Sequence, residues 1–169
     1  SFFCVISTEK YGFRGNVRHL DLNRDFIKCD SKNAQSFNKL FNKWKPEVMI
    51  DNHTSNGADY QYVMTLIATQ KDQLNQHVSA YMTDKMLPEL YSGMATKRYE
   101  MTPYVYARKT PDEGIAGFFD LPRYSSGYAA IHNTISFMPE THMLKSYKDR
   151  VLSTYDFSLT VLEHINRHR

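Results

Sequence analysis

Polar side chains gather at four places where the sequence predicts that a strand ends. One is the stretch "VMIDNHTSNGADY", in which apolar residues run into Asp51 and His53 and then into a polar loop with a glycine. The other three are residues 13–26, the loop with Tyr124 and Tyr128, and residues 137–142. In α/β sheets, binding and catalytic sites form where strands end. The pattern therefore indicates a functional site at these strand ends. His53 is either one of its side chains or an ordinary turn histidine.

The order of these motifs resembles that of the zinc carboxypeptidase family, the metallopeptidases of the carboxypeptidase A type. The similar segments are "GNVRHLDLNRDF", a strand that runs into "DNHTSNGADYQY", and "SFMPETH", and together they extend over most of the chain. The resemblance implies that His53 binds a zinc ion and that Glu140 is the general base. It also implies that Asn23 and Arg24 hold the free C-terminal carboxylate of a peptide substrate.

The same resemblance implies two further roles. Arg14 lies nine residues before Asn23, which fits the spacing of the oxyanion-stabilising arginine in family branches with a short loop. Either Tyr124 or Tyr128 would close over the substrate, and the sequence leaves both as candidates. The specificity pocket is expected between Gly114 and Ile131, where charged and aromatic residues are mixed and indicate no particular preference.

The chemistry of such a site explains the residue types. A zinc ion held by two histidines and one glutamate lowers the pKa of its bound water and polarises the scissile carbonyl. A separate glutamate takes the proton from that water and passes it to the leaving amine. A guanidinium binds a carboxylate through two parallel hydrogen bonds, and an arginine also stabilises a developing oxyanion. The resemblance thus predicts a zinc metallocarboxypeptidase acting on a peptide or a peptidoglycan-derived substrate.

One motif of the family is missing. The first two zinc ligands arrive there as H-x-x-E, and no histidine of the 169-residue sequence is followed by a glutamate at that spacing. A single imidazole does not hold zinc against water. Either the chain is the C-terminal part of a longer catalytic domain, or it is a metal-free relative that binds carboxylates without turnover. Within the hydrolases, an N-acyl amino-acid deacylase of the same superfamily is the alternative to a peptidase.

The composition argues against some classes of binding partner. The net charge is only +3, with basic residues scattered among acidic ones, so nucleic acid is not an expected partner. No apolar run reaches the roughly 18 to 20 residues that a bilayer span requires. Cys4 and Cys29 show none of the spacings of zinc ribbons or redox pairs, and whether they pair is open. Because peptidases of this type are mostly exported, a periplasmic or secreted location is expected; the oligomeric state is not readable.

The elements that must position these residues follow from periodicity. Ser31 is a predicted N-cap of an amphipathic helix that Pro46 stops. A second helix is predicted over 71–91, bent or ended by Pro88, and a third from Lys145 onward. Strands are predicted over residues 47–51, 60–67, 104–108 and 131–138, with the first two as neighbours, and 110–128 is predicted as an irregular connection.

Strands that alternate with helices predict an α/β domain with a mixed central sheet flanked by helices. One domain over residues 1–169 is expected from the length. By the resemblance, this domain would be zinc-carboxypeptidase-like, of the phosphorylase/hydrolase-like type, and an incomplete C-terminal portion of the whole.

Overall fold

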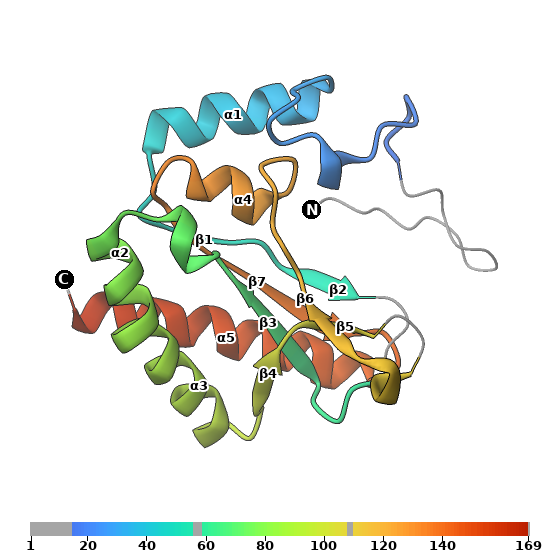
Figure 1. The fold of residues 1–169 in the computed structure, drawn as a ribbon, viewed down its shortest axis with the longest axis vertical. Helices are drawn as coiled ribbons and strands as arrows, with labels where there is room; N and C mark the ends of the chain where they lie inside the picture. Colours follow the sequence, from blue (N-terminus) through green and yellow to red (C-terminus); the bar gives the residue numbers. More distant parts are fainter. Residues whose placement is uncertain (1–14, 56–58, 108–109, 169) are drawn as a thin grey trace.

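A mixed five-stranded sheet forms the centre of the computed structural model, which describes residues 15–55, 59–107 and 110–168 (Figure 1). Its middle strand is β7 (Ile135–His142). Along one side of β7 run β1 (Val48–Ile50) and then β2 (His53–Ser55), both parallel to it. On the other side β3 (Met64–Ala68) is antiparallel to β7, and β4 (Met101–Pro103) follows parallel to β3. The prediction of a mixed sheet in an α/β fold is thus confirmed.

Helices cover both faces of the sheet (Figure 1). The long helix α5 (Tyr147–Arg167) and helix α3 (Leu87–Thr96) lie on one face, and α1 (Lys32–Trp44) and α4 (Ser125–Ala130) lie on the other. A small second sheet of β5 (Val105–Ala107) and β6 (Ile115–Gly117) lies beside them, and a 3₁₀ turn, Pro111–Glu113, lies between its two strands in the chain. None of the helices in the described part of the chain combines the length and the apolar character of a membrane span.

Two apolar cores correspond to the two faces. The larger one packs α3 and α5 onto the sheet through completely buried residues such as Leu90, Phe137 and Phe157. The smaller one joins α1 to α4 through Phe41, Tyr128 and Ala129. Because side chains alternate along a strand, the odd-numbered Ile135 and Phe137 of β7 enter the larger core. The even-numbered residues of β7 therefore face the α4 side.

Helix α1 forms as predicted because its signals are local. The Ser31 hydroxyl accepts a hydrogen bond from the backbone N–H of Ala34, at 3.0 Å. The helix ends at Trp44, Lys45 takes a left-handed conformation with φ of 46°, and Pro46 prevents continuation. The helix predicted from Lys145 onward is likewise confirmed as α5, capped by Ser146.

The helix predicted over 71–91 is longer and less regular than expected. It consists of a 3₁₀ turn (Lys71–Gln73), α2 (Gln76–Tyr81), a π-helical segment (Met82–Met86) and α3. Pro88 does not end this helical segment, because the proline occupies the first turn of α3. The N–H of Leu87 bonds to Met82 five residues earlier, and this wider turn accommodates a proline that a regular helix would reject.

Several strand predictions were wrong in position or pairing. The predicted neighbours are β1 and β3, but β7 lies between them. The strand placed at 131–138 begins only at Ile135 and runs to His142, because α4 and a turn occupy the preceding residues. The strand predicted at 104–108 corresponds to the short β5, which follows β4 in the chain and pairs with β6. The connection predicted as irregular contains β6 and the start of α4.

Pro139 explains a gap beside the middle strand. It lies in β7, a central strand, where a proline removes one ladder donor. The pairing of β7 with β1 stops at Phe137 and resumes with β2 at Glu140, so Pro139 lies opposite the break between β1 and β2. The chain crosses this break at Asp51, whose N–H still bonds to the Phe137 carbonyl at 2.9 Å.

Candidate functional site

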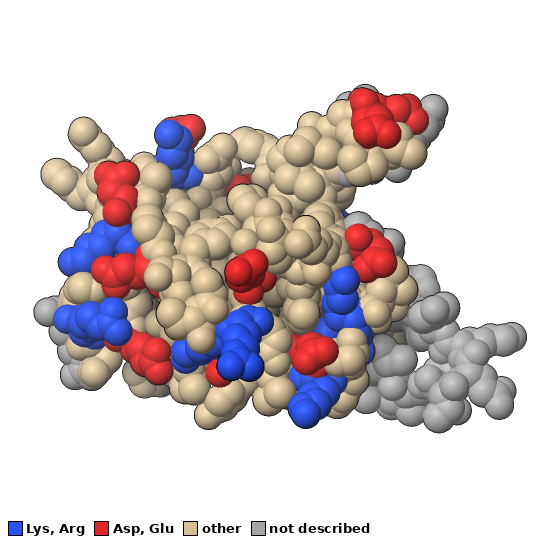
Figure 2. Space-filling model, turned by 90° about the horizontal axis from the view of Figure 1, so that it is seen from below, with Lys and Arg blue, Asp and Glu red and all other residues tan. Residues whose placement is uncertain are grey.

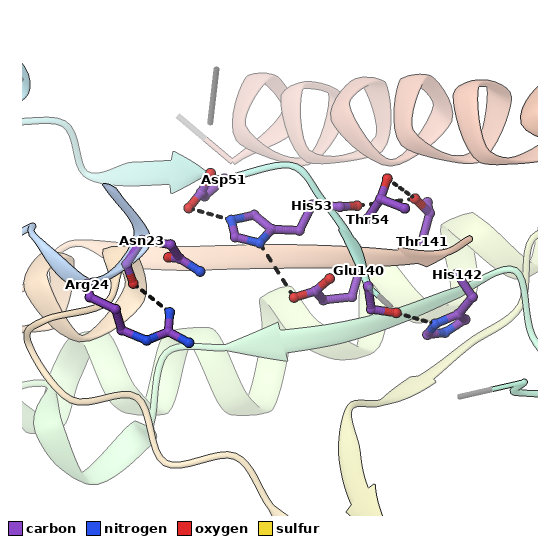
Figure 3. A network of polar contacts seen from close by, with 9 residues as sticks. Asn23, Arg24, Asp51, His53, Thr54, Glu140, Thr141 and His142 are labelled. Atoms are coloured by element: carbon purple, nitrogen blue, oxygen red, sulfur yellow. Dashed lines mark hydrogen bonds and ion pairs between the residues drawn. The ribbon is translucent and has the colours of Figure 1, made fainter. Parts of the chain in front are cut away.

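The first part of the site is a row of three ionisable side chains at the break between β1 and β2. The parallel pairing of β2 with β7 places His53 directly opposite Glu140. His53 Nε2 lies 2.9 Å from Asp51 Oδ2, and His53 Nδ1 lies 3.5 Å from Glu140 Oε1 (Figure 3). All three side chains are between 10% and 12% exposed, so their charges act on one another with little screening by water.

The electrostatics of this row favour a positive charge on the imidazole. Burial lowers the pKa of His53, but the hydrogen bond and charge of Asp51 and the charge of Glu140 together raise it above its ordinary value. Burial likewise raises the pKa of Asp51, yet His53, helped by Ser125, brings it below the ordinary value. The two carboxylates beside His53 therefore favour its protonated form.

The orientation of the His53 ring suits a metal ligand as well as a proton carrier. When Nε2–H donates to Asp51, Nδ1 carries the lone pair and points toward Glu140. Such carboxylate–imidazole pairs orient many metal-binding histidines. The described residues nevertheless bring only this one imidazole to the site, and no third metal-ligating side chain among them completes a group here. They do not by themselves form the three-ligand zinc site that the resemblance implies.

The second part of the site is the Asn23–Arg24 turn. These residues belong to a short 3₁₀ turn, Leu22–Arg24, which Asp21 caps by accepting from the N–H of Asn23 at 2.9 Å. Arg24 donates to the Asn23 carbonyl at 2.7 Å. The buried Asn23 Oδ1 has no hydrogen-bond partner among the described residues. Figure 3 shows both side chains in one view with Asp51, His53 and Glu140.

Arg24 is held by an aromatic ring. Its guanidinium lies 4.4 Å from the centre of the Tyr124 ring, and no carboxylate in the described part of the chain forms an ion pair with it. The buried Asp25 directly follows this turn. Its carboxylate accepts hydrogen bonds from the backbone N–H groups of Asp30 and Ser31, at 2.9 Å each, and so holds the end of the turn in place. Arg24 is therefore a positioned cation that can still bind an anion.

The two tyrosine candidates lie in different places. Tyr124 contacts Arg24 on its ring and accepts a 2.9 Å hydrogen bond from Arg123. Tyr128 is 2% exposed, donates its hydroxyl hydrogen to Asn38 and packs on Phe41 with ring centres 5.3 Å apart. Tyr124 thus belongs to the candidate site, whereas Tyr128 forms part of the smaller core.

Some predicted features lie elsewhere or outside the description. Arg14 and Cys4 are outside the described residues, and Cys29 carries a free thiol. The segment expected to determine specificity reaches the site at Phe118, whose ring contacts that of Tyr124 with centres 4.9 Å apart. Its role in specificity remains a prediction.

A second pair, which the sequence did not predict, lies on the same face as His53 and Glu140. Ser55 Oγ lies 2.6 Å from Nδ1 of the fully buried His142, and the Tyr60 ring stacks on His142 at 4.3 Å. Burial and the charge of Lys145 lower the His142 pKa. Strand alternation was the available signal, because Ser55 and His142 each follow a site residue by two positions.

Comparison with known proteins yields no relative. No family model matches the chain, and neither the curated proteins nor the solved structures contain a match. The site is therefore interpreted from its own geometry.

Proposed function

We propose that this chain is the C-terminal portion of a zinc-dependent metallocarboxypeptidase that hydrolyses the C-terminal peptide bond of a peptide or peptidoglycan-derived substrate. The observation that carries the proposal is the register of β2 on β7. It places His53 Nδ1 3.5 Å from Glu140 Oε1, and both side chains are largely buried. The remaining zinc ligands would have to come from beyond the described residues. An exported location goes with this proposal.

Substrate recognition is assigned to Asn23 and Arg24. A terminal carboxylate is planar and negatively charged, and a guanidinium fits it with two hydrogen bonds. Arg24 is already oriented by the Tyr124 ring, so less side-chain freedom is lost when the substrate binds. The Asn23 side-chain amide is next to it in the chain and can donate to a second carboxylate oxygen.

Proton transfer is assigned to Glu140. Its carboxylate would accept the proton of the attacking water and later deliver it to the leaving amine. Asp51 has a positioning role, because it holds the His53 ring with Nδ1 turned toward Glu140. Asp51 and His53 are two positions apart and so share one face. Asp51 still bonds to Phe137 of β7, and His53 pairs with Glu140, on either side of the break opposite Pro139.

A second candidate function is a metal-free relative that binds carboxylates. It is favoured by the single imidazole that the described residues bring to the site. In that case Arg24 and Asn23 would retain their ligand, but Glu140 would have no activated water to deprotonate.

Metal content and turnover together test the proposal. Zinc retained after dialysis would be measured in the gene product extended upstream, with and without His53→Ala. His53→Ala is expected to lose about one zinc ion per chain relative to the parent, and the parent is expected to cleave free but not amidated peptides. If His53→Ala retains as much zinc as the parent, or the extended protein cleaves no substrate, the peptidase proposal is wrong. Faster cleavage of acylated amino acids than of peptides would identify the deacylase instead.

A further inference from the structure

A cluster of two histidines and a glutamate joins α3 to α5 on the other face of the sheet. Glu89 lies in the first turn of α3, and His164 and His168 lie at the end of α5. The sheet lies between α3 and α5, which carry this cluster, and α4, which lies on the side of the His53 site (Figure 1). Nothing in the peptidase proposal uses these residues.

The donor atoms of this cluster converge. Glu89 Oε2 lies 2.9 Å from His164 Nδ1 and 3.0 Å from His168 Nε2. The two imidazoles are one helical turn apart, which brings them to the same side of α5, with ring centres 4.6 Å apart. If three ligands lay at about 2.1 Å from an ion in tetrahedral geometry, neighbouring donors would be about 3.4 Å apart. The Glu89 carboxylate, which is 34% exposed, would have to move slightly away from the two rings to reach that spacing.

Tyr81 holds one of the rings in place. Its hydroxyl lies 2.9 Å from His164 Nε2, on the side opposite to Glu89. His164 is 2% exposed, so its ring has little freedom to turn away. Metal-binding histidines commonly have their second nitrogen fixed in this way, which leaves the first directed at the ion.

Access and charge are also suitable. His168 is about one fifth exposed and, with Tyr81, lines a surface pocket, so an ion and its water can reach the cluster. Arg167 lies 3.4 Å from Glu89 and would oppose a cation, but its side chain is 65% exposed and can move into solvent. Figure 2, which views the molecule from the side of α3 and α5, shows positive and negative side chains interspersed. No strong positive field therefore excludes a cation from this face.

We propose that Glu89, His164 and His168 bind a divalent transition-metal ion of the zinc class, with water in the fourth position. Two imidazoles and one carboxylate form a donor set that suits zinc and not calcium or magnesium. The ion would link α3 to α5, the two helices that cover the larger core. Its role would be structural, since it would tie these two helices together.

Zinc titration of the His53→Ala chain tests this site separately from the proposed active site. Binding would be followed by calorimetry and by the melting temperature, with cobalt absorption as a report of imidazole ligation. About one ion per chain and a melting temperature raised by roughly 5–10 °C at a hundredfold excess over Kd are expected. His168→Ala should abolish both effects, because it removes one ligand from a partly exposed position where the fold tolerates the loss.

Two further variants make the test decisive. Glu89→Gln keeps the shape of the side chain and should weaken binding at least tenfold. The matched control is His132→Ala, which removes an exposed histidine on the α4 side and should leave zinc binding unchanged. Equal binding by the His168→Ala and parent chains, or no binding at micromolar zinc, would overturn the proposal. Neither result would bear on the peptidase, whose zinc depends on His53.

Discussion

Replacing Arg24 by alanine removes the one guanidinium that the proposed clamp uses. The side chain is half-buried, oriented on Tyr124 and without a carboxylate partner in the described part of the chain, so its loss should leave the fold intact. Hydrogen bonds to a charged group contribute about 1.5–3 kcal/mol. At about 1.4 kcal/mol for each tenfold change, the Kd of a ligand with a free carboxylate should rise roughly 10- to 100-fold.

The assay is calorimetric binding of an N-blocked dipeptide acid and of the corresponding amide. Only the acid should lose affinity in Arg24→Ala, and Arg24→Lys should lie in between because an ammonium lacks the paired donors. Arg123→Ala is the matched control, since its guanidinium also lies over the Tyr124 ring, at 4.9 Å. An equal loss for the amide, or an equal loss in Arg123→Ala, would refute the clamp.

Three other predictions concern the site and its supports. In the proposed peptidase, extended upstream, Glu140→Gln should lower kcat by about 10²- to 10⁴-fold with an unchanged circular dichroism spectrum, and unaltered turnover would remove Glu140 from the proposed mechanism. Asp51→Asn should lower the pKa of His53, since it removes the charge and weakens the hydrogen bond that raise it; NMR titration of the ring reports this, and an unchanged pKa would contradict the pairing. Asp25 has a pKa below its ordinary 3.8, because the hydrogen bonds and charges around its carboxylate outweigh burial. Its stabilisation is therefore present above about pH 4 and lost as the pH falls through the lower folded pKa. Asp25→Asn should cost on the order of 1–2 kcal/mol in urea unfolding at pH 6 and much less near pH 2, whereas a cost independent of pH would show that the charge is unimportant.

Local signals in the sequence predicted the elements that depend on them. Helix α1 has its cap, Ser31, and its stop, Pro46, close together in the sequence, and α5 has a long amphipathic pattern, so both could be read directly. Helix α4 was missed because "SSGYAA" has no amphipathic period and is buried throughout. A Cβ at Gly127 would lie 2.3 Å from the Asp120 carbonyl, so this helix also depends on close contact with the loop just before it.

The site could be predicted in its parts but not in its assembly. The motif order pointed to His53, Glu140, Asn23 and Arg24 through resemblance alone. That His53 lies opposite Glu140 depends on the register of two strands 87 residues apart, which no local pattern encodes. The contact of Arg24 with Tyr124 is likewise a tertiary one, and it is what distinguishes Tyr124 from Tyr128.

The central position of β7 determines when the sheet can form. It is the last strand among the described residues, and it bonds to partners 67 to 88 residues earlier on its two sides. Before β7 is inserted, the β1–β2 segment and the β3–β4 pair have no hydrogen-bonded strand between them, and both expose unpaired edges. Such non-local pairing is slow, because the long loops must close before their contacts form. A chain emerging from the ribosome therefore has His53 without Glu140 until β7 has emerged, so the sheet and the candidate site are assembled in the same step.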